Sequence, residues 1–341
     1  MSKLSICVLF GSGGEGKVPS VQSAVSVLKS LDPRRYHLLP VCITPEGDWI
    51  LYGSEDYEQL LSETWFLDPA NRRVGISPEK DHCLLTYECD CVVRQRIDVA
   101  FPLLHGALES VQEQLLQAGI PSVCSDPATC EMTRNRILSK QIADKAGVAT
   151  APWLQVRCAD VKLRPEWVLE ELEQRLDYPM YAKNVRRIDG GKVFIATCRD
   201  QLLEGLNDLS GEEEWLLVES GVEGWEVEVA VMGNAVPVAT VCAEIDVCEV
   251  TNAYIPARIP EEQQERVREA AVKLYSALGC RGVCGFSFFV RYDRGEVVFK
   301  RADPQPELSE AGVVANLFAA SGFSMEQLLG ELIELAMEVA Q

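Results

Sequence analysis

The chain opens with an apolar strand, a glycine cluster and an amphipathic helix, and this order restricts the fold more than any other feature of the sequence. Residues 4–10 (LSICVLF) form a continuous apolar run, which is typical of a strand buried on both faces. Glycines dominate residues 11–16, and residues 20–31 then carry apolar side chains at helical spacing. A strand that passes through a glycine-rich turn into a helix begins a parallel α/β unit. We therefore predict an α/β protein.

Apolar periodicity predicts further elements along the chain. In the first part we expect strands at 36–43, 98–104 and 120–125 and a helix at 112–118. In the middle we expect a basic helix at about 133–145 and strands at 180–183 and 192–197, separated by a basic loop (NVRRIDGG) that looks suited to cross a ligand. In the last part we expect an antiparallel meander at 215–220, 225–233 and 235–245, a strand pair at 283–290 and 296–302, and helices at about 260–279 and 325–339.

Length and charge limit the classes of protein that this chain can represent. At 341 residues it exceeds one ordinary core, so two or three domains are expected, and its 47% hydrophobic content is enough to fill them. The 32 basic and 52 acidic residues give a net charge of −20, which repels nucleic acid and anionic membranes. The N-terminal apolar run is too short for a signal peptide, and no run approaches the roughly 18 residues of a membrane span. We therefore expect a cytoplasmic protein that binds neither nucleic acid nor membranes.

The thirteen cysteines predict reduced thiols rather than a metal centre. Most of them lie among apolar residues, as Cys7 and Cys284 do, where a thiol behaves as a small hydrophobic group. Cys83, Cys89 and Cys91 come closest to a cluster, but a zinc site needs four ligands at paired spacing, and no second CxxC or histidine pair follows.

Several strings of residues match the landmarks of one known family in the right order. They are VLFGSGGEGKVPSVQS, DVAFPLLHG, TRNRILSKQIADKAGVATAPW, YPMYAK, LLVESGVEGWEVEVAVMGN and YIPARIPEEQ with the helix that follows. Over roughly residues 4–338 the chain thus resembles the D-alanine:D-alanine ligase family. The resemblance implies an ATP-grasp fold with a Rossmann-like N-terminal domain (1–125), a central ATP-grasp lobe (126–218) and a C-terminal lobe (219–341). It also implies a homodimer formed through the N-terminal domain and a role in peptidoglycan synthesis.

The resemblance implies an ATP site between the two lobes. Glu219 corresponds to the hinge glutamate that meets the adenine amino group, and Glu226 to a glutamate that accepts hydrogen bonds from the ribose hydroxyls. Because Glu226 alternates with apolar neighbours, an ordinary outward-facing strand residue is the alternative, and Lys183 has the parallel alternative of a surface lysine at a strand end. The basic residues that the resemblance places near the phosphates are Lys183, Arg136, Arg186, Arg187 and Lys192.

The positions that hold magnesium in the family carry different residues here. The family's "RVDFF" reads GFSFF, with Ser287 at the aspartate, and its "NEIN" reads KRAD, with Arg301 at the glutamate and Asp303 at the asparagine. A guanidinium repels a dication, so the two-Mg²⁺ arrangement is not expected, and Asp303 alone would hold a metal only weakly. Arg301 either contacts phosphate in place of a metal or forms a salt bridge with Asp303 or Glu307.

The acyl-transfer side of the family site is also altered. Gly285 stands at the arginine that stabilises the oxyanion, and Glu307 stands where the second D-alanine's carboxylate binds. The span between Glu244 and Ile255 is too short for the family's lid. On the substrate side, Glu15 matches the amine-binding glutamate if one residue is deleted before it, and His105 keeps the histidine of "LHG".

Three hypotheses follow from this pattern. In the first, the protein has weakened or lost the standard ligase activity and retains nucleotide binding. In the second, it is a working ATP-dependent carboxylate-amine ligase with a metal-poor site for D-alanine or another small amino acid. The third, a dimeric scaffold, has no feature of its own in the sequence.

Overall fold

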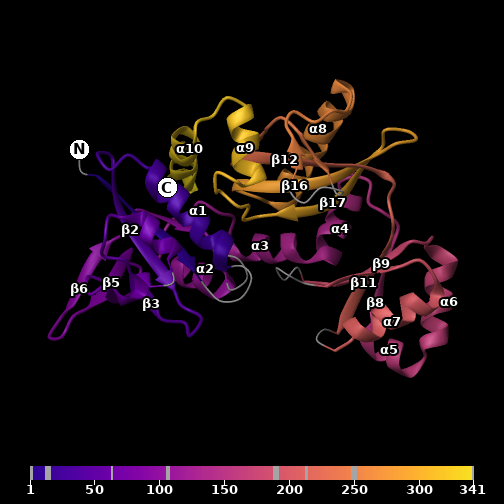
Figure 1. The fold of residues 1–341 in the computed structure, drawn as a ribbon, viewed down its shortest axis with the longest axis horizontal. Coiled ribbons are helices and arrows are strands. Elements are labelled where there is room, and N and C mark those ends of the chain that lie inside the picture. The colour runs from indigo at the N-terminus through magenta and orange to yellow at the C-terminus, as the bar shows by residue number, and fades with distance from the viewer. Residues whose placement is uncertain are drawn as a thin grey trace.

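The computed structural model describes residues 3–11, 17–62, 64–104, 108–186, 192–211, 214–246 and 252–339. Its strands form three sheets, which Figure 1 shows in three parts of the molecule. A seven-stranded sheet has the order β6-β5-β4-β3-β2-β1-β7, and a four-stranded sheet has the order β10-β9-β11-β8. A third sheet has the order β15-β14-β12-β16-β17, with β13 paired to β12. The predicted α/β class is confirmed.

The seven-stranded sheet begins as a parallel unit, as the opening of the sequence predicts. It contains β1 (Leu4–Gly11), β2 (Tyr36–Ile43) and β7 (Val99–Pro102), with the helices α1 (Lys17–Ser30) and α2 (Leu108–Gln117). β1 pairs in parallel with both β2 and β7. Gly11 ends β1 with a φ of +103°, and an added Cβ would lie 2.4 Å from the carbonyl oxygen of Ile43, so glycine is required there.

An antiparallel extension of this sheet was not predicted. It consists of β3 (Trp49–Leu51), β4 (Arg72–Ile76), β5 (Cys83–Tyr87) and β6 (Val92–Arg96), with short 3₁₀ turns η1 (Tyr57–Leu61) and η2 (Trp65–Leu67). β4 and β6 carry exposed basic residues and β3 is only three residues long, so the segment lacks the sustained apolar pattern that marks a strand. The strand predicted at 120–125 is wrong, because Ser122 makes only an isolated bridge to Ala100.

Two helices cross from the first sheet toward the other two (Figure 1). They are α3 (Pro127–Arg134) and α4 (Arg136–Lys145), where one helix at 133–145 was predicted. Asn135 separates them: its backbone is extended, and its side chain accepts hydrogen bonds from the amides of Ile137 and Leu138 as the N-cap of α4.

The four-stranded sheet and its helices form the lobe at the lower right of Figure 1. The elements are β8 (Trp153–Arg157), α5 (Cys158–Leu163), α6 (Pro165–Arg175), β9 (Met180–Asn184), β10 (Val193–Ala196), α7 (Arg199–Leu209) and β11 (Trp215–Ser220). All strand pairs in this sheet are antiparallel. The predicted strands at 180–183, 192–197 and 215–220 are confirmed to within one or two residues. The predicted meander is wrong, because β11 belongs to this sheet and the segments at 225–233 and 235–245 belong to the third sheet.

The third sheet forms the upper part of Figure 1 together with three helices. The elements are β12 (Gly224–Gly233), β13 (Val238–Ala239), β14 (Ala243–Asp246), β15 (Asn252–Tyr254), α8 (Glu261–Leu278), β16 (Gly282–Arg291), β17 (Val297–Asp303), α9 (Val313–Ala320) and α10 (Met325–Val339). Odd-numbered residues of β12, such as Val227 and Val229, pack in one core with α8. Side chains alternate along a strand, so Glu226 and Glu228 share the opposite face.

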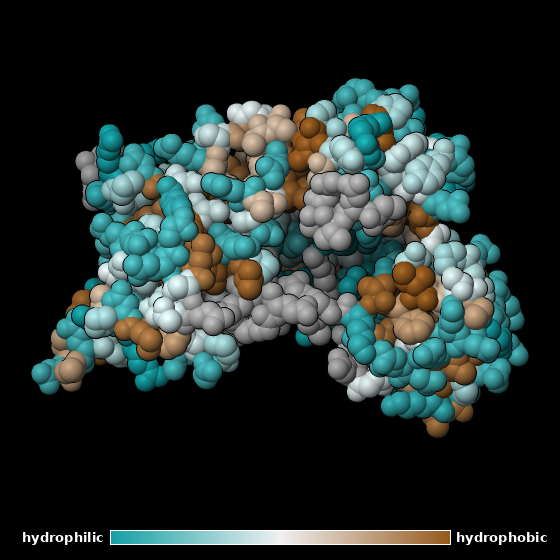
Figure 2. Space-filling view, in the orientation of Figure 1, coloured by the Kyte–Doolittle hydropathy of each residue, from teal (hydrophilic) through white to brown (hydrophobic). Residues whose placement is uncertain are grey.

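One hydrophobic core joins the first and last parts of the chain. Phe10 and Phe101 from the parallel sheet belong to the same buried cluster as Leu317 of α9 and Leu329 of α10. The helix α10 packs against α1, as the yellow and indigo ribbons of Figure 1 show. The surface seen in Figure 2 is mostly hydrophilic, with scattered hydrophobic groups. Within the described ranges, none of the helices has the length and apolar character that crossing a membrane requires.

Candidate functional site

A cavity of about 770 Å³ lies between the four-stranded sheet and the third sheet. Strands β9, β11, β12 and β17 contribute to its walls, together with the first turns of α4. The polar and aromatic residues that line it include Arg136, Lys140, Tyr181, Lys183, Glu219, Trp225, Glu226, Glu244, Phe289, Lys300 and Arg301. A cavity of this size with converging charged groups is suited to a polar small molecule that also has a flat apolar part.

One wall of the cavity holds a buried carboxylate between two ammonium groups. Glu219 Oε2 lies 2.7 Å from Lys140 Nζ, and Lys183 Nζ donates a hydrogen bond to Glu219 Oε1. Burial raises the pKa of the Glu219 carboxyl, but the charges of Lys140 and Lys183 more than offset this effect and lower its pKa to about 2. Burial lowers the pKa of Lys183, which Glu219 opposes. One carboxylate therefore serves two lysines, and an excess positive charge faces the cavity.

A second wall carries the pair Glu226 and Lys300. Glu226 lies on β12, and its Oε1 accepts a hydrogen bond of 2.6 Å from Lys300 Nζ on β17. Both side chains are largely buried, with exposed fractions of 11% and 26%. Glu226 thus faces the cavity, although its acceptor oxygen is engaged by a lysine.

Ser287 and Arg301, which the resemblance predicts at the family's metal positions, form a hydrogen-bonded cluster around Glu228. Strand register places Glu228 of β12 opposite Ser287 of β16, and Ser287 opposite Arg301 of β17. Arg301 Nη2 donates to Glu228 Oε1 at 2.8 Å, and Ser287 Oγ donates to the same oxygen at 3.0 Å. Arg301 thus forms a salt bridge, as one of the two alternatives predicted, but with Glu228, a partner two strands away across the sheet that was not predicted.

Asp303 and Glu307 line a smaller cavity that meets the first at Arg301. This second cavity has a volume of about 190 Å³ and also contacts Gly285 and Glu228. Asp303 Oδ1 accepts a hydrogen bond of 3.1 Å from the backbone amide of Gln305. Within the ranges that the structure describes, no three histidine, cysteine or acidic side chains are grouped as metal ligands would be.

The basic residues predicted near the phosphates separate into two groups. Arg136 and Lys183 line the cavity. In contrast, Arg186 Nη2 pairs with Glu131 at 2.9 Å and Lys192 Nζ pairs with Asp208 at 3.0 Å, and neither residue is part of the cavity wall. Arg187, Glu15 and His105 lie outside the described residues, as does most of the basic loop.

Three residues of the site were missed from the sequence: Lys140, Glu228 and Lys300. Lys140 lies one helical turn after Arg136, so the spacing in TRNRILSK already places both on one face of a helix. Glu228 follows Glu226 by two residues in the string WEVEV, which puts both carboxylates on one face of a strand. Lys300 carries no comparable signal, because its partner depends on strand register.

Comparison with known proteins gives a consistent result over almost the whole chain. The family model described as D-ala D-ala ligase N-terminus matches residues 5–125, and that described as D-ala D-ala ligase C-terminus matches residues 142–334. The D-alanine–D-alanine ligase of Chlorobium phaeovibrioides is 30% identical, and the match covers 100% of this chain and 99% of that protein. The ligase of Chlorobium chlorochromatii is 31% identical over 99% of both chains.

Solved structures agree with the sequence comparison. The VanG D-Ala:D-Ser ligase from Enterococcus faecalis has a TM-score of 0.87 and 27% identity, covering 98% of this chain and 100% of that one. The D-alanine-D-alanine ligase from Coxiella burnetii has a TM-score of 0.90 at 22% identity over 100% and 96% of the two chains, which supports the fold alone. The three sheets are thus arranged as in the ATP-grasp ligases, and the chain belongs to the D-alanine:D-alanine ligase family.

Proposed function

We propose that this protein is a nucleotide-binding member of the family in which the standard magnesium-dependent ligase activity is strongly weakened or lost. The observation that carries the proposal is the contact of Arg301 and Ser287 with Glu228, at the positions where the family holds its metal ions. A cytoplasmic protein, a homodimer formed through the N-terminal domain and a link to peptidoglycan precursor synthesis belong to the same proposal.

The cavity fits a nucleotide. Glu219 and Glu226 present carboxylate acceptors for an adenine amino group and ribose hydroxyls, while Lys183 and Arg136 supply positive charge for phosphates. A crystal structure of the ligase from Bacillus anthracis complexed with ATP has the same fold, with a TM-score of 0.73 at 20% identity over 99% of this chain and 98% of that one. In a working ligase ATP would supply the phosphoryl group that activates a carboxylate.

The residues at the metal positions do not fit Mg²⁺. Magnesium prefers carboxylate, carbonyl and water oxygens, and it binds poorly beside a fixed positive charge. Arg301 brings such a charge, and its guanidinium already pairs with the carboxylate of Glu228 at 2.8 Å. Asp303 remains as a single carboxylate whose Oδ1 accepts from a backbone amide. These residues therefore do not provide a site in which Mg²⁺ could assist a reaction.

The acyl-transfer groups are depleted as well. Gly285 offers no donor at the position of the oxyanion arginine, and Glu307 puts a negative charge into the cavity where a carboxylate substrate would bind. Loss of one oxyanion donor typically costs on the order of 3 kcal/mol of transition-state stabilisation. Such losses do not simply add, but several of them leave little of a normal rate.

The alternative is an active ligase for D-alanine or another small amino acid that uses Arg301 in place of a metal. One observation favours it: Arg301 lines both cavities and is therefore placed where phosphate and acceptor would meet. In this alternative the guanidinium would contact the phosphoryl oxygens directly.

One assay separates the two proposals. Purified protein is incubated with ATP, D-alanine and Mg²⁺, and dipeptide and ADP are measured beside a Lys183→Ala control. We expect no dipeptide above the control, and formation of dipeptide would overturn the loss of activity. Calorimetry with ATP, with and without Mg²⁺, tests the nucleotide site separately. We expect similar affinity in both conditions, and the absence of binding in both would overturn the nucleotide claim.

A further inference from the structure

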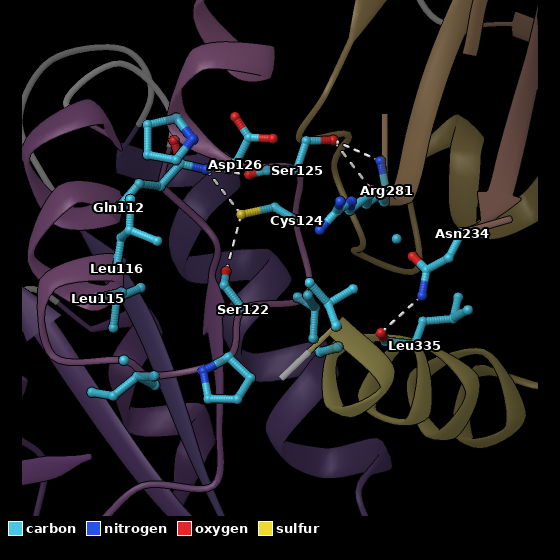
Figure 3. Close-up of a pocket in the computed structure, with 18 residues that line it drawn as sticks. Gln112, Leu115, Leu116, Ser122, Cys124, Ser125, Asp126, Asn234, Arg281 and Leu335 are labelled. Carbon is cyan, nitrogen blue, oxygen red and sulfur yellow. Dashed lines mark hydrogen bonds between the residues drawn. The ribbon is translucent and has the colours of Figure 1, made fainter. Parts of the chain in front are cut away.

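A second pocket lies outside the nucleotide cavity, where α2 and the segment after it meet α10 and the start of β16 (Figure 3). Its volume is about 220 Å³, and most of its lining is apolar. Two cysteines lie at this pocket or directly behind it. Cys124 is partly exposed and forms part of the wall, whereas Cys130 on α3 is completely buried. Cys124 is therefore the member of the pair that borders the pocket, and Cys130 is the member that solvent does not reach.

The two sulfur atoms share the same hydrogen-bond donor. Gln112 Nε2 lies 2.9 Å from Cys124 Sγ and 3.3 Å from Cys130 Sγ, and Ser122 Oγ lies 3.1 Å from Cys124 Sγ. Figure 3 shows Cys124 between Gln112 and Ser122. The Cys130 side chain also neighbours that of Cys124 and influences its pKa. Cys124 is thus surrounded by donors that favour its thiolate form.

The orientation of the Gln112 amide is fixed by a group that can only accept. Gln112 Nε2 also donates to the backbone carbonyl of Ser125 at 3.1 Å. If the amide were reversed, its oxygen would face this carbonyl oxygen, which is unfavourable. Ser125 is held in turn by Arg281, whose backbone amide donates to Ser125 Oγ at 3.0 Å. With one N–H donated to this carbonyl, the amide has one N–H left, which the two sulfurs share.

The pKa values of the two thiols move in opposite directions. The neighbouring Cys130 side chain lowers the pKa of Cys124, with help from Ser122 and Gln112 and against the effect of burial. The same contact and its burial raise the pKa of Cys130. This is the asymmetry of an attacking thiolate beside a protonated resolving thiol, and the apolar pocket leads to the attacking member.

We infer that Cys124 and Cys130 form a dithiol site that reacts with small hydroperoxides and closes to a reversible disulfide. Cys124 sulfur attacks the terminal oxygen of ROOH, so that an S–O bond forms, the O–O bond breaks and ROH leaves with the thiol proton. Cys130 sulfur then attacks Cys124 sulfur, so that the S–S bond forms, the S–O bond breaks and the hydroxyl leaves as water with the Cys130 proton. The two thiols lose two electrons and the peroxide gains them.

The test is chemical mapping of the complete, reduced protein. It is treated with one equivalent of hydrogen peroxide, denatured in N-ethylmaleimide and cleaved before aspartate without reduction. Cleavage before Asp126 separates the two cysteines, so a bond between them appears as two linked peptides. We expect this linkage to be the main product and to disappear with dithiothreitol. Oxidation of the exposed Cys89 or Cys91 first, with both Cys124 and Cys130 recovered as maleimide adducts, would overturn the inference.

Two variants test the mechanism. Cys130→Ala should stop at the Cys124 sulfenic acid, which dimedone labels, and an absence of label on a folded variant would contradict the assignment. Gln112→Leu removes the shared donor at similar volume and should slow disulfide formation about fivefold. Gln114→Leu lies on the exposed side of the same helix and should leave the rate unchanged. Equal rates in both glutamine variants would mean that Gln112 does not support the thiolate.

Discussion

The wall around Glu219 and the cluster around Glu228 are both partly buried arrangements of charges, but they leave different charges for a ligand. Glu219 is shared by Lys140 and Lys183, so positive charge remains in excess. Glu228 is matched by the single cation of Arg301 and by the Ser287 hydroxyl, so the charges cancel. The wall around Glu219 therefore has a net positive charge that can attract an anion, whereas the cluster around Glu228 has no net charge. This difference is what supports the proposal that the protein retains nucleotide binding without the family's usual metal ions.

The largest effect is expected from Glu219→Gln. This change leaves two buried lysines without a carboxylate, and removal of one partner from a buried ion pair costs about 3 to 5 kcal/mol. The free energy of unfolding from urea titration should fall by this amount. Glu223→Gln, at an exposed position between β11 and β12, should change it by less than about 0.5 kcal/mol. Equal changes in the free energy of unfolding for the two variants would show that the buried Glu219 pairs contribute no more than an exposed residue.

The Glu219 carboxylate should also make the free energy of unfolding depend on pH. The pKa of Glu219 is held at about 2 in the folded protein, against about 4.3 in an unfolded chain. Because the folded pKa is depressed, the stabilisation is present above pH 4.3 and is lost as the pH falls toward 2. Between pH 5 and pH 3 the wild type should lose about 2 kcal/mol more than Glu219→Gln. Parallel losses in the two proteins would contradict the shifted pKa.

Two carboxylates introduced beside Glu228 should enable the cluster around Glu228 to bind Mg²⁺. Ser287→Asp combined with Arg301→Glu removes the cation and adds hard oxygen ligands, so Mg²⁺ at many times its dissociation constant should stabilise the variant by about 2 kcal/mol. Thermal unfolding with Mg²⁺ or with chelator measures this. The wild type should show no such shift. Arg294→Glu, which reverses a charge on an exposed turn, is the control.

The Glu228–Arg301 pair itself should contribute less. Arg301 keeps about a third of its side chain exposed, so solvent screens the interaction. A double-mutant cycle with Glu228→Gln and Arg301→Met should give a coupling energy of about 1 kcal/mol. A coupling near zero would show that the two groups are neighbours without a stabilising interaction.

The smallest effect is expected from Lys192→Met. Its pair with Asp208 is exposed and lies away from the cavity, and such pairs contribute less than about 0.5 kcal/mol. Urea unfolding should detect no change, and the affinity for ATP should change less than twofold. A tenfold loss of ATP affinity would assign Lys192 to the nucleotide site after all.

Apolar periodicity predicted the helices and strands in which one face is clearly apolar and the other polar. The helix at Met325–Val339 is strongly amphipathic and was predicted at its observed bounds. The helix predicted at about 133–145 corresponds to α4, whereas α3 was missed. Asn135 separates the two helices by capping hydrogen bonds that periodicity does not reveal. The antiparallel strands β3 to β6 were missed because each has at most five residues and because exposed arginines interrupt the apolar pattern of β4 and β6.

The residues of the site were also predicted only where a local sequence motif marks them. The resemblance led to Glu219, Lys183 and Arg136, which line the cavity because the family landmarks fix their places on strands and helices. The partner of Arg301 was predicted among sequence neighbours, whereas the actual partner lies about seventy residues earlier, on the strand two positions across the sheet. Such a contact depends on strand order and register, which an isolated motif does not encode.

The core shared by the two ends of the chain has a consequence for biosynthesis. Phe10 and Phe101 belong to strands that leave the ribosome early, but they are packed with Leu329 of α10, which leaves it last among the described helices. Until α10 arrives, the parallel sheet has an apolar face open to water, and such faces promote aggregation of nascent chains. The N-terminal third therefore completes its packing only after translation of the C-terminal helix.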